Sequence, residues 1–175
     1  GWIYQRLGDY PQAVKHLEAK LELRRTIGDR YGEATALSHL GWVAHDQGDY
    51  QAGLAYCRQA LDISRLINDR ENEAYALAGM GLNQEQLDNH EAAAENYRTA
   101  LAIHAEIGAA TLAVFDQAGL ARIALVQNNP QQAQTYITPV VNWVQAGNAQ
   151  KFWDPWIIYL SAYEVLTALG QAETA

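Results

Sequence analysis

A period of 40 residues constrains the fold of this chain more than any other feature of the sequence. The dipeptides Gly1-Trp2, Gly41-Trp42 and Gly81-Leu82 are each separated by 40 positions. The segment Leu-Gly-Asp-Tyr at 7–10 returns as Gln-Gly-Asp-Tyr at 47–50, and Ile-Gly-Asp-Arg at 27–30 returns as Ile-Asn-Asp-Arg at 67–70. A fixed period of this length is typical of arrays in which each repeat is one supersecondary unit that packs against its neighbours.

Within each repeat the apolar residues follow a helical period. Leu37, Leu40 and Ala44 fall on one face of a helix, and a second stripe of this kind runs from Gly53 to Ser64. Between the two stripes stands Gly48-Asp49, where glycine can adopt positive φ and aspartate can cap the next helix. The pattern therefore predicts helix, tight turn, helix and short loop in every repeat.

Two columns of small residues run through the repeats at equivalent positions. One column holds Gly1, Gly41, Gly81 and Ala121, and the other holds Ala13, Gly53, Ala93 and Ala133. Glycine inside a helix costs about 1 kcal/mol relative to alanine, so a whole column of small residues indicates a close helix–helix crossing. We expect the two helices of each hairpin to approach each other closely there.

These patterns predict helix boundaries along the whole chain. The first helices of the hairpins are expected at about 1–7, 31–47, 71–87 and 111–127, and the second helices at 10–27, 50–67, 90–107 and 130–146. Asp154-Pro155 resembles a helix start and predicts a ninth helix over 155–169. Pro139 is expected to bend or break the 130–146 helix.

The motifs of the second and third repeats resemble the tetratricopeptide repeat family. Leu40-Gly41, Gly48-Asp49-Tyr50 and Ala60-Leu61 match the family pattern in the second repeat, and Met80-Gly81 and Ala100-Leu101 match it in the third. The family repeat is about 34 residues long, so this longer form is similar to kinesin light chains, Pins-type spindle adaptors and the arrays of bacterial transcriptional activators.

The resemblance implies an all-α fold, a right-handed α-α superhelix of about four helix hairpins with a C-terminal capping helix. The implied domains are a repeat array over 1–146 and a loop with a capping helix over 147–175. The array divides into repeats at about 1–30 (truncated), 31–70, 71–110 and 111–146. Because the chain lacks an initiator methionine and starts inside a repeat, we also expect it to be part of a longer protein.

In this family the first helix of each hairpin lines a concave groove that receives a peptide or a partner helix. Carried over by register, the groove residues expected to bind a partner are Trp2, Arg6, Ser38, His39, Trp42, His45, Tyr75, Leu82, Glu85, Phe115 and Arg122. Aromatic residues exposed in such a groove would be candidate hot spots, whereas the alternative is that they pack between helices.

The sequence departs from two ligand-binding patterns of the family. The columns in which chaperone-binding members carry Lys and Asn hold Trp2, His39, Tyr75 and Gly79, so the carboxylate clamp is missing. The column in which spindle adaptors carry Asn holds Trp2, Trp42, Leu82 and Arg122. A ligand of this chain is therefore expected to be more apolar than theirs.

Composition narrows the function classes further. The net charge of −8 disfavours nucleic acid and anionic membranes, which both attract basic surfaces. No apolar run approaches the roughly 20 residues of a membrane span. The single cysteine, Cys57, allows no internal disulfide and fits a cytoplasmic protein. The five histidines and Cys57 form no metal-binding spacing or catalytic triad, so we expect no enzyme activity, metal or cofactor.

The C-terminal quarter contains a cluster of aromatic residues: Trp143, Phe152, Trp153, Trp156, Tyr159 and Tyr163. This cluster is expected either to cap the last hairpin or to form a contact surface for another domain or for a second copy of the chain.

The resulting hypothesis is a protein-interaction module of a bacterial signalling or transcriptional regulator, or of a scaffold, that binds a peptide or partner protein in its groove. We also expect that two copies of the chain can form a homodimer through the exposed ends of the array. The alternatives are a passive structural spacer and a small-molecule or inducer-sensing array of a transcriptional regulator. A small-molecule site would need a closed pocket with convergent polar groups.

Overall fold

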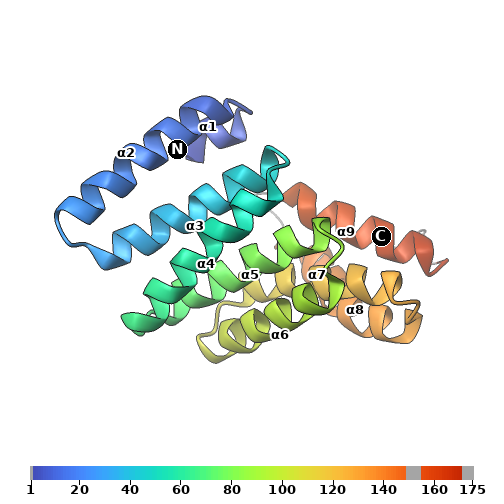
Figure 1. Cartoon of the computed structure of the whole chain (residues 1–175). Helices are drawn as coiled ribbons and strands as arrows, with labels where there is room; N and C mark the ends of the chain where they lie inside the picture. Colours follow the sequence, from blue (N-terminus) through green and yellow to red (C-terminus); the bar gives the residue numbers. More distant parts are fainter. Residues whose placement is uncertain (1, 149–154, 171–175) are drawn as a thin grey trace. The chain divides into compact units, whose positions relative to one another are not determined.

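Over residues 2–145 the chain folds into helices joined by short turns (Figure 1). The computed structural model describes residues 2–148 and 155–170. In this part of the chain there are nine helices: α1 (Trp2–Arg6), α2 (Tyr10–Thr26), α3 (Arg30–Asp46), α4 (Tyr50–Leu66), α5 (Arg70–Gln86), α6 (His90–Glu106), α7 (Ala110–Val126), α8 (Pro130–Gln145) and α9 (Pro155–Ala168). The expected all-α fold is confirmed, and each predicted helix lies within one or two residues of its expected ends.

Polar caps explain why the helices begin where they do. The Oδ1 atoms of Asp29, Asp49 and Asp69 accept hydrogen bonds from the backbone N–H three residues later, at 2.8, 3.0 and 3.1 Å. These bonds satisfy N–H groups that have no partner within the helix. The preceding residue of each turn is left-handed, with φ of 71° at Gly28, 80° at Gly48 and 54° at Asn68. The Gly-Asp signal of the sequence is thus a helix stop followed at once by a helix start.

The chain divides into two compact units, Gly1–Asn96 and Tyr97–Ala175, and the boundary falls within α6. In the first unit α3 packs against α2, α4 and α5. In the second unit α7 packs against α8, and α9 packs against both of them. Consecutive helices therefore pair within each unit, as the repeat pattern predicts.

The small-residue columns allow the close crossing that the sequence predicts. A Cβ atom at Gly41 would lie 3.0 Å from the backbone oxygen of Gly53 and would overlap the Sγ atom of Cys57. A Cβ atom at Gly53 would in turn overlap the side chain of Asn83. Because part of the surrounding of Gly41 is backbone of α4, α3 and α4 can approach this closely only if Gly41 stays small, whereas Gly53 leaves room on α4 for Asn83 of α5.

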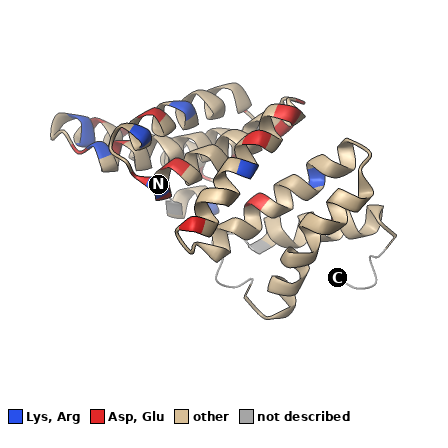
Figure 2. Ribbon diagram, turned by 90° about the horizontal axis from the view of Figure 1, so that it is seen from below, with Lys and Arg blue, Asp and Glu red and all other residues tan. Residues whose placement is uncertain are grey.

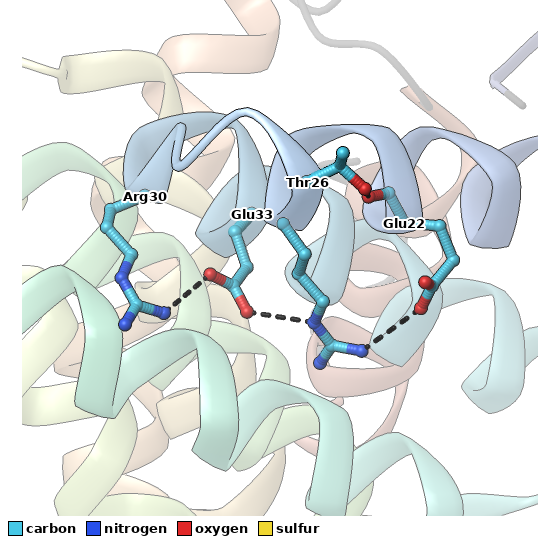
Figure 3. Close-up of polar contacts among 5 residues, drawn as sticks. Glu22, Thr26, Arg30 and Glu33 are labelled. Carbon is cyan, nitrogen blue, oxygen red and sulfur yellow. Dashed lines mark hydrogen bonds and ion pairs between the residues drawn. The ribbon is translucent and has the colours of Figure 1, made fainter.

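Ion-pair clamps join the second helix of one hairpin to the first helix of the next. Glu33 accepts hydrogen bonds from Arg25 Nε at 2.9 Å and from Arg30 Nη1 at 2.8 Å, and Arg25 also lies 3.6 Å from Glu22 (Figure 3). Burial by itself would raise the pKa of Glu33, but the two guanidinium groups outweigh it and lower that pKa. Arg65, Arg70 and Glu73 repeat the same geometry one period later.

The third loop has lost this polar framework. The positions equivalent to the two arginines and the glutamate are Ala105, Ala110 and Ala113, and the capping aspartate is replaced by Ala109. Ala109 precedes α7 and makes no side-chain capping bond. The N–H of Leu112 instead bonds to the carbonyl of Ala109 at 3.0 Å. The start of α7 therefore depends on backbone and apolar contacts.

We expect Ala109→Asp to raise the free energy of unfolding by about 0.5–1 kcal/mol, because it restores the cap that the other loops possess. The measurement is a urea titration followed by circular dichroism, in which the midpoint should rise with an unchanged slope. Ala109→Leu is the control, since it adds a side chain without an acceptor. An equal shift for both variants would contradict the capping explanation.

Pro139 lies inside α8 without breaking it, so of the expected bend or break the break is wrong and the bend stays a prediction. Proline removes the hydrogen bond to the carbonyl of Thr135 four residues earlier. Both Thr135 and Pro139 are exposed, so water can satisfy that carbonyl.

Charged residues are distributed unevenly among the helices. They are frequent in α2 through α6, whereas α7 carries only Asp116 and Arg122, α8 carries none and α9 carries only Glu164 (Figure 2). The surfaces of α8 and α9 are therefore nearly neutral.

Candidate functional site

The expected groove residues lie on the first helices of the hairpins, and their exposure differs. Arg6 is exposed, and five others are partly exposed: His39, His45, Tyr75, Glu85 and Arg122. Four are buried: Ser38, Trp42, Leu82 and Phe115. The side chain of Trp2 lies outside the described part of the structure. Phe115 and Arg122 belong to the second unit and the other residues to the first.

Trp42 is only 3% exposed because Tyr75 covers it. The two rings stack with centroids 5.1 Å apart and planes 19° apart. Gly79 makes this possible, since a Cβ atom there would lie 3.0 Å from Trp42 Nε1. The expectation that Trp42 is exposed is therefore wrong. The indole packs between α3 and α5, as in the alternative interpretation from the sequence.

The other three buried residues also pack in the protein interior. Ser38 is fully buried, Leu82 is 4% exposed and Phe115 is 3% exposed. Phe115 meets the ring of Tyr97 edge-on at 6.0 Å. Their burial leaves little surface for a partner, so their place in a binding groove stays a prediction from register.

His39 and Tyr75 form the partly exposed surface that remains on α3 and α5. Their rings meet edge-on at 5.9 Å with planes 66° apart. Thr35 stands one turn before His39, donates to the carbonyl of Tyr31 at 2.9 Å and lies 3.4 Å from the Oδ1 atom of Asn72. We name Thr35, His39 and Tyr75 the aromatic face.

The aromatic face is uncharged at neutral pH. Burial, with a smaller contribution from Lys20, lowers the pKa of His39 to about 4. Burial also raises the pKa of the Tyr75 hydroxyl. Because both groups stay neutral, the face can stack against apolar groups and exchange neutral hydrogen bonds, but it offers no charge to an ionic ligand.

The polar residues among the expected groove positions, and their neighbours, make contacts within each unit. Gln5 of α1 donates to Asp46 of α3 at 2.7 Å, and His45 lies 5.3 Å from the ring of Tyr50. In the second unit, Arg122 of α7 donates to the hydroxyl of Ser161 of α9 at 2.5 Å. Arg122 therefore helps to attach α9.

The cavity in the first unit lies away from these residues. It has a volume of about 380 Å³ and lies between α2, α3 and α4, where it is lined by Glu18, Leu21, Glu22, Arg25, Leu37, Leu40, Tyr56 and Gln59. None of the expected groove residues lines it. The aromatic face is thus not part of this cavity.

Sequence reasoning missed a buried pair of ionisable residues, His104 and Asp116. The Nδ1 atom of His104 in α6 lies 2.6 Å from the Oδ2 atom of Asp116 in α7, and the two side chains are 1% and 0% exposed. Burial raises the pKa of Asp116 to about 6, against the opposing effect of His104. The equivalent positions are Ser64 and Ala76 one repeat earlier, and that double departure was the available signal.

Within the described residues, no group of three His, Cys, Asp or Glu side chains could hold a metal ion. The same residues contain no helix that is long and apolar enough to cross a membrane.

Cys57 is fully buried, and burial raises the pKa of its thiol to about 12. We expect the native thiol to react with a disulfide reagent at pH 8 at least about 100-fold more slowly than the unfolded chain, because the thiolate is the attacking species. Following thiol release with and without urea tests this expectation. A native rate within a few-fold of the unfolded rate would contradict the burial of Cys57.

A model of the tetratricopeptide repeat family matches residues 1–52 and 43–106. No protein of curated function matches the chain significantly.

Several solved structures share its fold. BtubC (BKLC) from P. vanneervenii superimposes with a TM-score of 0.76 and 17% identity, covering 98% of this chain and 71% of that one. A signal transduction ATPase with numerous domains and a tetratricopeptide repeat sensor, from Pyrococcus horikoshii, superimposes with a TM-score of 0.73 and 21% identity. The match covers 94% of this chain and 27% of that one. The TPR-like repeats of a kinesin light chain-like protein from Podosopora anserina superimpose with a TM-score of 0.70 and 16% identity. The match covers 97% of this chain and 83% of that one. At these identities the likeness concerns the fold.

Proposed function

Because the chain belongs to the tetratricopeptide repeat family, whose repeats generally mediate protein–protein interaction, we propose that it binds a peptide or partner protein through the aromatic face. The observation that carries this proposal is the contact of His39 and Tyr75 above the buried Trp42. Partly exposed aromatic rings on a rigid base lose little conformational freedom when they bind.

The proposed ligand presents apolar and neutral polar groups. His39 stays uncharged at neutral pH, and Thr35 adds a hydroxyl to the same face. His45, Glu85 and Arg6 are proposed as polar contacts at the edge. Trp2 is proposed as a further contact from its register alone. Arg122 is proposed as a contact that the second unit makes by itself.

We place this activity in a larger bacterial cytoplasmic regulator or scaffold. The support for a regulator is the fold that the chain shares with the tetratricopeptide repeat sensor of the signal transduction ATPase from Pyrococcus horikoshii, and the bacterial setting rests on the sequence resemblance to the arrays of bacterial transcriptional activators. In such a setting, occupancy of the repeats would be relayed to other domains. A free buried cysteine fits a reducing compartment.

The test is an affinity capture from the native lysate with the parent chain and a His39→Ala/Tyr75→Ala variant. We expect a partner that binds the parent and is reduced at least about 10-fold with the variant, as for hot-spot residues. The matched control is His16→Ala/Tyr56→Ala, which removes the same residue types from α2 and α4, away from the aromatic face. Circular dichroism checks that all three proteins are folded.

The other outcomes separate the alternatives. Equal capture by all three proteins would reject the aromatic face as the binding site. Capture of no partner would favour a passive spacer. Thermal stabilisation of the parent by a small-molecule extract, lost in the variant, would favour inducer sensing.

Self-association through the ends of the array is the second part of the proposal. Apolar side chains are exposed near both ends of the chain, with Ile3 65% and Leu7 74% exposed at one end and Trp156 78% exposed on α9. Exposed apolar surface of this kind is typical of interaction sites.

A further inference from the structure

The helix α9 has apolar residues on two faces. One face holds Ile158, Ala162 and Val165, which are buried where α9 packs on α7 and α8. The other face holds four exposed residues, which we name the α9 stripe: Trp156 (78% exposed), Tyr159 (42%), Leu160 (57%) and Tyr163 (57%). Their spacing of three and four residues places them in one continuous line along the helix.

The α9 stripe contains no charged residue. Its only charged neighbour on the helix is Glu164, which is exposed. Trp156 and Tyr159 already touch edge-on, with centroids 6.3 Å apart. A second stripe of the same composition would therefore meet no like charge in its centre.

The register of the stripe is self-complementary. If two copies of α9 pack antiparallel about a two-fold axis midway between Tyr159 and Leu160, Trp156 of one copy faces Tyr163 of the other. The same axis sets Tyr159 against Leu160 of the second copy. All four residues then contact the partner, as an isologous interface requires.

The exposed area suits a weak dimer. An aromatic side chain can bury about 150–250 Å², so the exposed fractions of the four residues amount to roughly 400–500 Å² per copy. Two copies would bury on the order of 1,000 Å², which is the lower limit for a specific interface.

We propose that the α9 stripe is the interface of a two-fold symmetric homodimer of this chain. This inference rests on the self-association proposed above, and it specifies which surface forms the contact and which symmetry the dimer has. A contact of α9 with the Ile3–Leu7 end of another copy would instead be heterologous and would build open chains of molecules rather than a closed dimer.

Sedimentation equilibrium over a concentration series tests the proposal. We expect the parent to move from the 19.4 kDa monomer to twice that mass at roughly micromolar concentration. Leu160→Glu should weaken the dimer about 100-fold or more, because it buries a charge in the interface without a partner. Ile3→Glu/Leu7→Glu is the control and should leave the dimer unchanged.

A charge-pairing experiment tests the register. Tyr159→Lys and Leu160→Glu should each be monomeric alone, and an equimolar mixture should restore the dimer, since the two positions face each other in the antiparallel arrangement. These side chains are exposed in the monomer, so both variants should remain helical by circular dichroism. Failure of the mixture to associate would overturn the proposed register.

The outcomes also separate this inference from the proposed self-association. A dimer that survives Leu160→Glu but is lost with Ile3→Glu/Leu7→Glu would place the contact at the other end and overturn the α9 interface alone. Masses that keep growing with concentration would overturn the closed dimer. A parent that stays monomeric at millimolar concentration would overturn both, without bearing on the aromatic face.

Discussion

Tyr97→Ala is expected to lower the free energy of unfolding by about 3–5 kcal/mol, the range for removing a large aromatic side chain from a core. Tyr97 is fully buried and meets Phe115 edge-on at 6.0 Å. Its ring fills the space left by Gly119, where a Cβ atom would lie 2.6 Å from the ring. Because glycine has no side chain to move into the vacated volume, the cavity should stay open. A urea titration of the parent and the variant measures the loss.

A double-mutant cycle with Gly119 tests the same contact from the other side. Gly119→Ala alone should destabilise by about 1–3 kcal/mol through overpacking against the ring. In the Tyr97→Ala background the added methyl has room, so it should be neutral or stabilising. Tyr97→Phe keeps the ring and serves as the control. Additive effects of the two changes would refute this packing explanation.

The helices could be predicted from the sequence because their ends depend on local chemistry. Asp29, Asp49 and Asp69 cap helices in the structure, as the Gly-Asp turns predict, and the 40-residue period carries these boundaries to weaker copies. Pro139 shows the limit of local reasoning, since α8 continues through it where the carbonyl of Thr135 is open to solvent. Ala109 shows that a helix can also begin without its cap when the repeat supplies the tertiary contacts.

The candidate site was harder to predict, because exposure depends on contacts between repeats. Register alone placed Trp42 on the groove column, but Tyr75 lies 33 residues later in the sequence and covers the indole only after α5 packs on α3. The contact between His104 and Asp116 could not be predicted for the same reason. Each residue by itself looks like an ordinary polar position, and only the packing of α6 on α7 brings the two side chains together.

His104→Ala is expected to destabilise the chain by about 3–5 kcal/mol at pH 7.5, the usual cost of removing one partner of a buried ionisable pair. Asp116 has no exposed surface, and its Oδ1 atom has no hydrogen-bond partner within the described residues. Without the imidazole at 2.6 Å, the carboxyl group must either ionise in an apolar surrounding or take up a proton.

The pH dependence identifies the cause of that loss. His104 opposes the burial that raises the pKa of Asp116 to about 6, so its removal should raise that pKa further. An acid whose pKa is higher in the folded than in the unfolded state binds more protons when folded, and stability then falls as the pH rises. Between pH 6 and 7.5 the His104→Ala variant should therefore lose stability with a slope of up to about 1.4 kcal/mol per pH unit. Urea titrations of His104→Ala and His104→Ala/Asp116→Asn across this range isolate the carboxyl group, since the double variant should lack the slope. Parallel curves for the two variants would show that a lost contact, rather than the buried charge, accounts for the destabilisation.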